Sequence, residues 1–222
     1  MFGKPTYDKD IKSIKHMNLK YTYWYFTHAI PQHICDQITK HAFSFKNKLA
    51  TIGDIKKINN IDDEKKVKQT RDSNVVFLDD RWIYNEIHPW ILQANKLAGW
   101  NFQWDVTEHV QFTIYDKGQF YDWHEDSWNE PYDNTNGAYS GKIRKLSASI
   151  LLSNPSEYTG GELEFEVAKS RLDKPPHFKV CNEIKEKGSI VIFPSFIKHR
   201  VKPVTKGRRL SLVAWNLGNP FK

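Results

Sequence analysis

The chain has 222 residues, and 33 Lys and Arg against 26 Asp and Glu give a formal net charge of +7. This length suits one β-rich domain with a substantial core. No run of about 18 apolar residues and no charged-then-apolar leader is present, so we expect a soluble, cytoplasmic protein without a membrane span. Two cysteines, Cys35 and Cys181, are too few for a disulfide framework.

Two helices are predicted in the first hundred residues. After an extended aromatic stretch over Leu19–Phe26, Pro31 at a first helical position opens a short amphipathic helix. A second helix is predicted over Asp80–Leu97, where apolar residues form one stripe and Pro89 is expected to cause a kink. Between them, Lys46–Arg71 is rich in lysine and lacks sustained periodicity, which predicts a solvated loop; a lid over a substrate is the functional alternative.

The rest of the chain is predicted to be mainly strands. Eight strands after two helices fit an α+β, mainly β fold, a jelly roll braced by N-terminal helices. We expect a single domain over 1–222, with supporting elements in 1–100 and the jelly-roll core in 101–217. The predicted strands are Phe102–Val106, Val110–Tyr115, Phe120–Asp126, Arg144–Ser153, Leu163–Val167, Ser189–Phe193, His199–Val204 and Arg208–Asn216.

A candidate metal site is outlined by His124-Glu125-Asp126 and, far downstream, His199. In an extended strand, residues two apart point to the same side, so His124 and Asp126 can reach one ion while Glu125 faces away. Two imidazoles and one carboxylate leave adjacent positions open, as in non-haem Fe(II) oxygenases. A structural zinc site would normally be closed by four ligands.

The spacing around these ligands resembles the prolyl-hydroxylase-like branch of the Fe(II)/2-oxoglutarate-dependent dioxygenases, of the prolyl/lysyl hydroxylase domain type. The matching motifs are Y-x-x-G-x-x-Y-x-x-H-x-D over Tyr115–Asp126, G-G-E-L over Gly160–Leu163, and F-P-S…H-x-V-x-P-V-x-x-G-x-R over Phe193–Arg209. The likeness extends more loosely over about two-thirds of the chain. It implies a double-stranded β-helix, Fe(II) held by His124, Asp126 and His199, 2-oxoglutarate and O2 as co-substrates, and ascorbate as a candidate reductant.

Arg209 is the candidate partner for the far carboxylate of 2-oxoglutarate, because a guanidinium fork suits a carboxylate better than an ammonium does. A turn over Val204–Gly207 predicts that His199 and Arg209 lie on antiparallel partner strands, a few residues out of register. Neighbouring strand residues face opposite sides, and the ten-residue spacing favours Arg209 over Arg208. Ser211 shares the face of Arg209, and Tyr115 is carried over from the motif as a further contact.

Substrate contact is predicted in Ser127–Gly141, which follows the ligand strand and contains Trp128, Tyr132 and Tyr139. These aromatic groups suit a prolyl or other amino-acid residue in a peptide or protein, or a free amino acid. Oxidative demethylation of alkylated nucleic acid is the alternative enzymatic interpretation, although lysines spread along the chain are typical of solvated faces. The third interpretation is a non-catalytic metal-binding jelly roll. The predicted co-substrate contacts at Tyr115, Arg209 and Ser211 argue against it.

Overall fold

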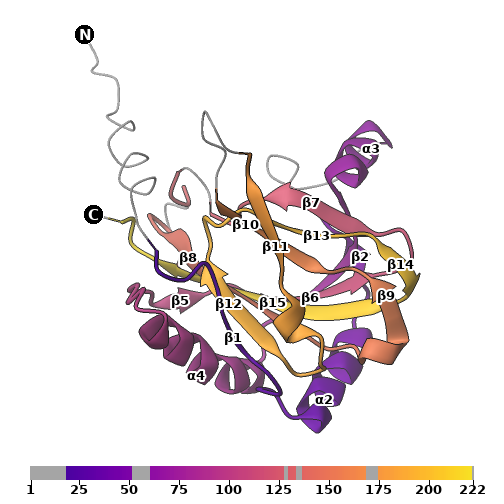
Figure 1. Cartoon of the computed structure of the whole chain (residues 1–222), viewed down its shortest axis with the longest axis horizontal. Coiled ribbons are helices and arrows are strands. Elements are labelled where there is room, and N and C mark those ends of the chain that lie inside the picture. The colour runs from indigo at the N-terminus through magenta and orange to yellow at the C-terminus, as the bar shows by residue number, and fades with distance from the viewer. Residues whose placement is uncertain (1–18, 52–60, 128–129, 134–136, 169–174, 222) are drawn as a thin grey trace.

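Two antiparallel sheets face each other in the computed structural model of the chain, which describes residues 19–51, 61–127, 130–133, 137–168 and 175–221 (Figure 1). The larger sheet has the order β1 (Trp24–Phe26), β12 (Ile190–Pro194), β8 (Ile143–Leu151), β15 (Arg209–Gly218), β6 (Val110–Tyr115), β4 (Asn74–Leu78) and β2 (Lys48–Leu49), with β5 (Val106–Thr107) paired to β15. The smaller has the order β11 (His177–Val180), β10 (Leu163–Ala168), β13 (His199–Val201), β7 (Phe120–His124) and β3 (Arg71–Asp72). A short ribbon pairs β9 (Tyr158–Gly160) with β14 (Val204–Gly207). This is the predicted double-stranded β-helix.

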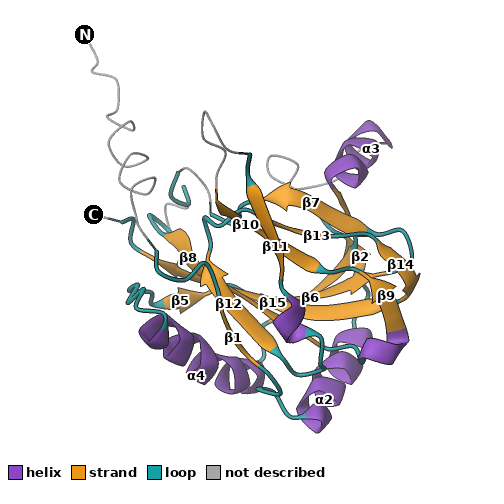
Figure 2. Cartoon of the chain, in the orientation of Figure 1, coloured by secondary structure: helices purple, strands orange, loops and turns teal. Residues whose placement is uncertain are grey.

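Two helices cover the outer face of the larger sheet, α2 (Gln32–Phe43) and α4 (Arg81–Leu97) (Figure 2). The predicted apolar stripe of α4 is buried, and Pro89 lies inside the helix. Pro31 is at the residue before α2 rather than in its first turn. On the sheet, alternate residues such as Phe112, Ile150 and Leu212 are buried beneath these helices.

A second core lies between the two sheets. It contains Phe165 of the smaller sheet and Val191 and Phe193 of the larger sheet, with Tyr115 at its edge. Phe165 and Phe193 meet edge to face, with ring centroids 4.9 Å apart. The inner faces of the sheets thus form the wall against which any site between them is built.

Three predicted strands differ from the structure. The stretch Phe102–Val106 forms a strand only from Val106, because the side chain of Asn95 exchanges two 2.9 Å hydrogen bonds with the backbone of Phe102 in place of a strand partner. The segment His199–Val204 is divided into β13 and β14, which pair with different strands. The strand that carries His124 ends there, so Asp126 lies two residues beyond it.

The predicted pairing of the strands that carry His199 and Arg209 is wrong. β13 pairs with β10 and β7 in the smaller sheet, whereas β15 pairs with β6 and β8 in the larger sheet. Val204–Gly207 is not a hairpin turn but the strand β14, which carries the chain from one sheet to the other. A turn over Asp116–Gly118 joins β6 of the larger sheet to β7 of the smaller sheet.

The lysine-rich stretch Lys46–Arg71 is more structured than predicted. It contains β2 and the helix α3 (Ile61–Thr70), while 52–60 lie outside the described residues. Acidic residues at the start of α3 and lysines towards its end complement the helix dipole, and Lys68 pairs with Glu64 at 2.7 Å one turn away. Val67 is fully buried while Ile61 is exposed, so α3 is anchored near its C-terminal end. A lid function stays a prediction.

No helix among the described residues is long and apolar enough to cross a membrane.

His88 on α4 gives a prediction about pH and stability. Its Nε2 lies 3.0 Å from Thr107 Oγ1, and that hydroxyl donates to Asn216 Oδ1 at 2.8 Å. Burial lowers the pKa of His88 below its usual value. Below about pH 6.5, His88 therefore binds a proton in the unfolded chain but stays neutral in the folded chain. The contribution of His88 to stability is complete above that pH and is lost as the pH falls.

We expect His88→Gln to lose less stability than wild type when the pH falls from about 7.5 to about 5.5. Urea unfolding of both proteins at the two pH values measures this difference. Equal losses in the two proteins would contradict the assignment of His88 as a half-buried, neutral base.

Candidate metal centre

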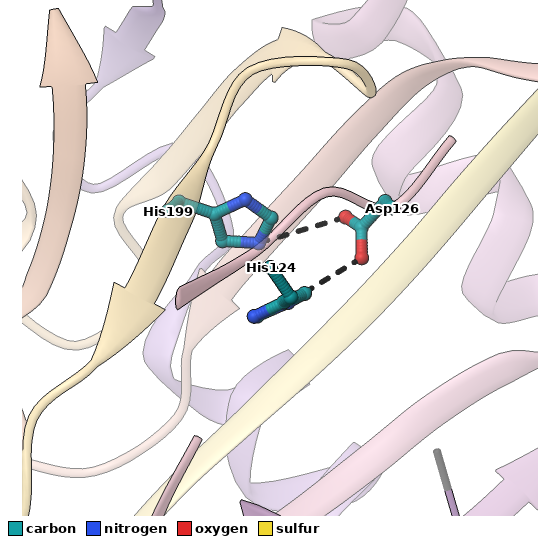
Figure 3. A group of neighbouring side chains, drawn as sticks. All are labelled: His124, Asp126 and His199. Carbon is teal, nitrogen blue, oxygen red and sulfur yellow. Dashed lines mark ion pairs between the residues drawn. The ribbon is translucent and has the colours of Figure 1, made fainter. Parts of the chain in front are cut away.

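Three side chains with metal-ligating atoms converge at the end of β7. The ligating atoms of His124, Asp126 and His199 all lie within 4.8 Å of one another (Figure 3). His124 Nε2 is 3.6 Å from Asp126 Oδ1, and His199 Nε2 is 3.7 Å from Asp126 Oδ2. His124 and His199 are directly paired residues of neighbouring strands, so their imidazoles project from one face of the sheet. Glu125 is exposed, as the spacing predicts.

Backbone contacts orient each ligand. His124 Nδ1 bonds the carbonyl of Asp122 at 2.7 Å, and His199 Nδ1 bonds that of Ile197 at 2.9 Å. With Nδ1 protonated and donating, each imidazole presents the lone pair of Nε2 to the shared space. The Asp126 amide donates to the carbonyl of Ser195 at 2.9 Å, which holds this ligand in place beyond the end of its strand.

The charge states of these groups suit a cation. Burial, with the neighbouring His199, lowers the pKa of His124 to about 3, so its imidazole is neutral at physiological pH. Burial alone would raise the pKa of Asp126, but the two imidazoles and Arg144 lower it below its usual value. The neutral imidazole of His124 and the ionised carboxylate of Asp126 are the forms in which these side chains bind metal. The residues therefore fit Fe(II) with open positions for further ligands.

The predicted co-substrate residues lie on the larger sheet. Arg209 is 3% exposed and donates from Nη1 to Ser211 Oγ at 3.1 Å. Its Cζ lies 5.7 Å from the ring centre of Tyr115, its register partner on β6. Arg208 is exposed and pairs with Asp116 at 2.6 Å. Alternation along β15 thus turns Arg209 inward and Arg208 outward.

Four further residues of the region between the two sheets, called the chamber below, were not predicted from the sequence. The ring of Tyr121 stacks on that of His124 with centroids 3.4 Å apart. Arg71, 5% exposed, lies over Tyr121 at 4.6 Å and donates to Ser73 Oγ. Arg144 lies over the indole of Trp215 at 3.9 Å. Alternation from Arg209 places Trp215 on the inward face of β15; that signal was available in the sequence, whereas the positions of Arg71 and Arg144 depend on tertiary structure.

The predicted substrate residues have different positions. Trp128 lies outside the described residues. The hydroxyl of Tyr132 donates to Glu108 at 2.8 Å, and the ring of Tyr139 is 5.9 Å from that of Tyr132. Glu108 also accepts two 2.6 Å hydrogen bonds from Arg144, whose Nη1 donates weakly to the backbone carbonyl of Asp126 at 3.4 Å. The predicted substrate segment is thus connected to the metal ligand by a chain of polar contacts.

Solved structures of prolyl hydroxylases share this fold. A prolyl-4-hydroxylase from Pseudomonas putida superposes with a TM-score of 0.62 at 17% identity, over 96% of this chain and 99% of that one. A viral collagen prolyl hydroxylase from Paramecium bursaria Chlorella virus-1, in its 2OG complex, gives 0.59 at 18% identity, over 90% and 97%. A third structure is a prolyl hydroxylase from Trichoplax adhaerens in complex with a peptide fragment of the hypoxia inducible factor oxygen degradation domain. Its TM-score is 0.62 at 14% identity, over 95% of this chain and 88% of that one.

Curated relatives match over part of their length. A PKHD-type hydroxylase of Pseudoalteromonas atlantica is 32% identical over 105 residues, covering 47% of this chain and 41% of the relative. One from a Picosynechococcus species is 32% identical over 124 residues, covering 56% and 48%. The chain thus spans about half the length of the curated relatives it matches.

The jelly roll carries a group of two histidines and one carboxylate, the ligand set typical of non-haem iron oxygenases. Residues 110–216 match the model of the 2OG-Fe(II) oxygenase superfamily, and this stretch contains all three ligands and Arg209. In these residues, nearly half of the chain, the sequence is similar to that superfamily and to the PKHD-type hydroxylases.

Proposed function

We propose that this protein is a 2-oxoglutarate-dependent hydroxylase that acts on a prolyl residue of a peptide or protein. The observation that carries the proposal is the group of His124, Asp126 and His199 on one side of the core between the sheets, with the buried Arg209 beside Tyr115 on the other side. Fe(II), when bound there, supplies the redox chemistry that couples oxidative decarboxylation of 2-oxoglutarate by O2 to hydroxylation of a C–H bond. Ascorbate is a candidate reductant for the metal.

Separate groups of residues bind the metal and the co-substrate. His124, Asp126 and His199 hold the metal, and the backbone bonds to Nδ1 fix both imidazoles in the ligating tautomer. Arg209 binds the far carboxylate of 2-oxoglutarate through a charge-assisted hydrogen bond, with Ser211 and Tyr115 beside it. Because these three side chains are buried, the local dielectric constant is low and their polar contacts are stronger than at the surface.

A peptide is supported as substrate by an unused hydrogen-bond donor. Trp215 is 6% exposed, and its indole Nε1 has no acceptor among the described residues. An unpaired buried donor costs about 1–3 kcal/mol, which a substrate carbonyl oxygen can recover. Tyr132, Tyr139 and Trp128 stay predicted contacts, and a cytoplasmic location stays a prediction.

The test supplies Fe(II), 2-oxoglutarate and O2 together with one substrate pool at a time. The pools are proline-containing peptides, the same peptides with alanine for proline, free amino acids and methylated single-stranded DNA. We expect succinate release to rise with the proline peptides alone, together with a mass gain of one oxygen atom per modified peptide. Release that rises with methylated DNA, and not with any proline peptide, would replace the proposal with the demethylase alternative.

A further inference from the structure

The second glycine of the G-G-E-L motif, Gly161, lies against the side chain of Arg209. Gly160 ends β9 and Gly161 follows it, with φ values of +79° and +67°. Such φ values favour glycine over residues with a side chain. The amide of Gly161 donates to the carbonyl of Pro203 at 3.1 Å. Pro203 is the residue before β14, so Gly161 lies beside the chain that leads into β15.

The space beside Gly161 is occupied by the stem of Arg209. A Cβ on Gly161 would lie 2.9 Å from Arg209 Cδ and 2.9 Å from Val204 Cγ2, closer than side-chain carbons approach in folded proteins. Val204 is 1% exposed and has no room to withdraw. Arg209 is 3% exposed, so its stem can yield only by moving the guanidinium from its position beside Ser211.

We propose that Gly161 is a positioning residue for Arg209, and that its missing side chain sets where the guanidinium meets the far carboxylate of 2-oxoglutarate. The inference rests on the proposed function, because it assigns Arg209 to that carboxylate. It explains the second glycine of the motif by a contact rather than by turn geometry alone. A methyl group at Gly161 would act on the far end of the co-substrate and leave its metal-binding end unaffected.

The experiment compares two ligands that share the same keto-acid end. 2-Oxoglutarate carries the far carboxylate and 2-oxobutyrate lacks it. Binding of each to the Mn(II)-loaded protein is measured by calorimetry in wild type, Gly161→Ala and Gly99→Ala. Gly99 is the matched control, since its φ is +70° and a Cβ there would meet nothing within 4 Å. Gly99→Ala therefore carries the same backbone strain without the contact.

We expect Gly161→Ala to weaken 2-oxoglutarate binding about tenfold, a loss within the range of one charge-assisted hydrogen bond. Binding of 2-oxobutyrate should stay unchanged, and Gly99→Ala should change neither ligand. A Gly161→Ala protein that keeps the wild-type preference for 2-oxoglutarate, or that weakens both ligands equally, overturns the inference. A wild-type protein with no preference between the ligands overturns instead the assignment of Arg209 in the proposed function.

A second variant keeps the test valid if Gly161→Ala does not fold. Removing Val204 Cγ2 opens space beside the new methyl group, so Gly161→Ala combined with Val204→Ala should fold. It should prefer 2-oxoglutarate over 2-oxobutyrate less than Val204→Ala alone does, because the methyl group still lies against Arg209 Cδ. Val204→Ala alone is its reference. A double variant that binds 2-oxoglutarate as tightly as Val204→Ala, and much more weakly than wild type, would show that Val204 rather than Gly161 positions Arg209, and would overturn the inference.

Discussion

Replacing His199 with alanine is expected to abolish hydroxylation while leaving the fold intact. His199 supplies one of three ligands, and even partners that only support a metal ligand change affinity or activity by about 10–100-fold, so the loss of a ligand should exceed that range. The imidazole lies between Phe193 and Asp126, whereas β13 itself is held by backbone pairing with β10 and β7, which the substitution leaves in place. The measurements are metal content after loading with Fe(II) or Mn(II), and succinate release with a proline peptide.

His177→Ala is the control for this prediction, because His177 is an exposed histidine of β11 in the same sheet. It should keep metal content and turnover at the wild-type level. Unchanged metal stoichiometry and activity in His199→Ala would rule out the assigned centre.

The second large effect is expected at Arg209. Arg209→Ala should raise the 2-oxoglutarate KM by about 10–100-fold, since a hydrogen bond to a charged group contributes ~1.5–3 kcal/mol. Lysine should restore only part of the affinity, because it keeps the charge and loses the planar fork. Steady-state kinetics at saturating peptide, with 2-oxoglutarate varied, measures the change.

Arg208→Ala is the matched control. It removes a neighbouring arginine of the same charge whose side chain is exposed and pairs only at the surface with Asp116. Its KM should stay close to wild type. If the two substitutions raised the KM equally, the inward face of β15 would not be the co-substrate face.

What could be predicted from the sequence follows from alternation along single strands. The period of two predicts opposite faces for Arg208 and Arg209, which the structure has, and it predicts that His124 and Asp126 come together, which they do although Asp126 lies beyond the end of β7. The same period does not tell which sheet a strand joins. For that reason the chain from His199 to Arg209 was predicted as a hairpin, whereas it crosses between the sheets.

Residues recruited from distant elements were the hardest to predict. Arg71 reaches the chamber because β3 pairs with β7, and Arg144 because β8 lies next to β15. Neither carries a local motif that marks it as part of a site. Trp215 differs, since it continues the inward alternation of Arg209 and Ser211 and could have been assigned with them.

The direct pairing of His124 with His199 has a consequence for how the centre assembles. Two of the three ligands are opposite residues of one strand pair, so the backbone hydrogen bonds that align β7 with β13 also set the separation of the imidazoles. Folding itself therefore bears the entropic cost of bringing them together, and an incoming ion meets a preformed pair. A slip of one residue in that pairing would turn one imidazole to the outside of the sheet and remove the centre in a single step. The alignment of β7 with β13 therefore determines whether this protein can bind a metal ion at this centre.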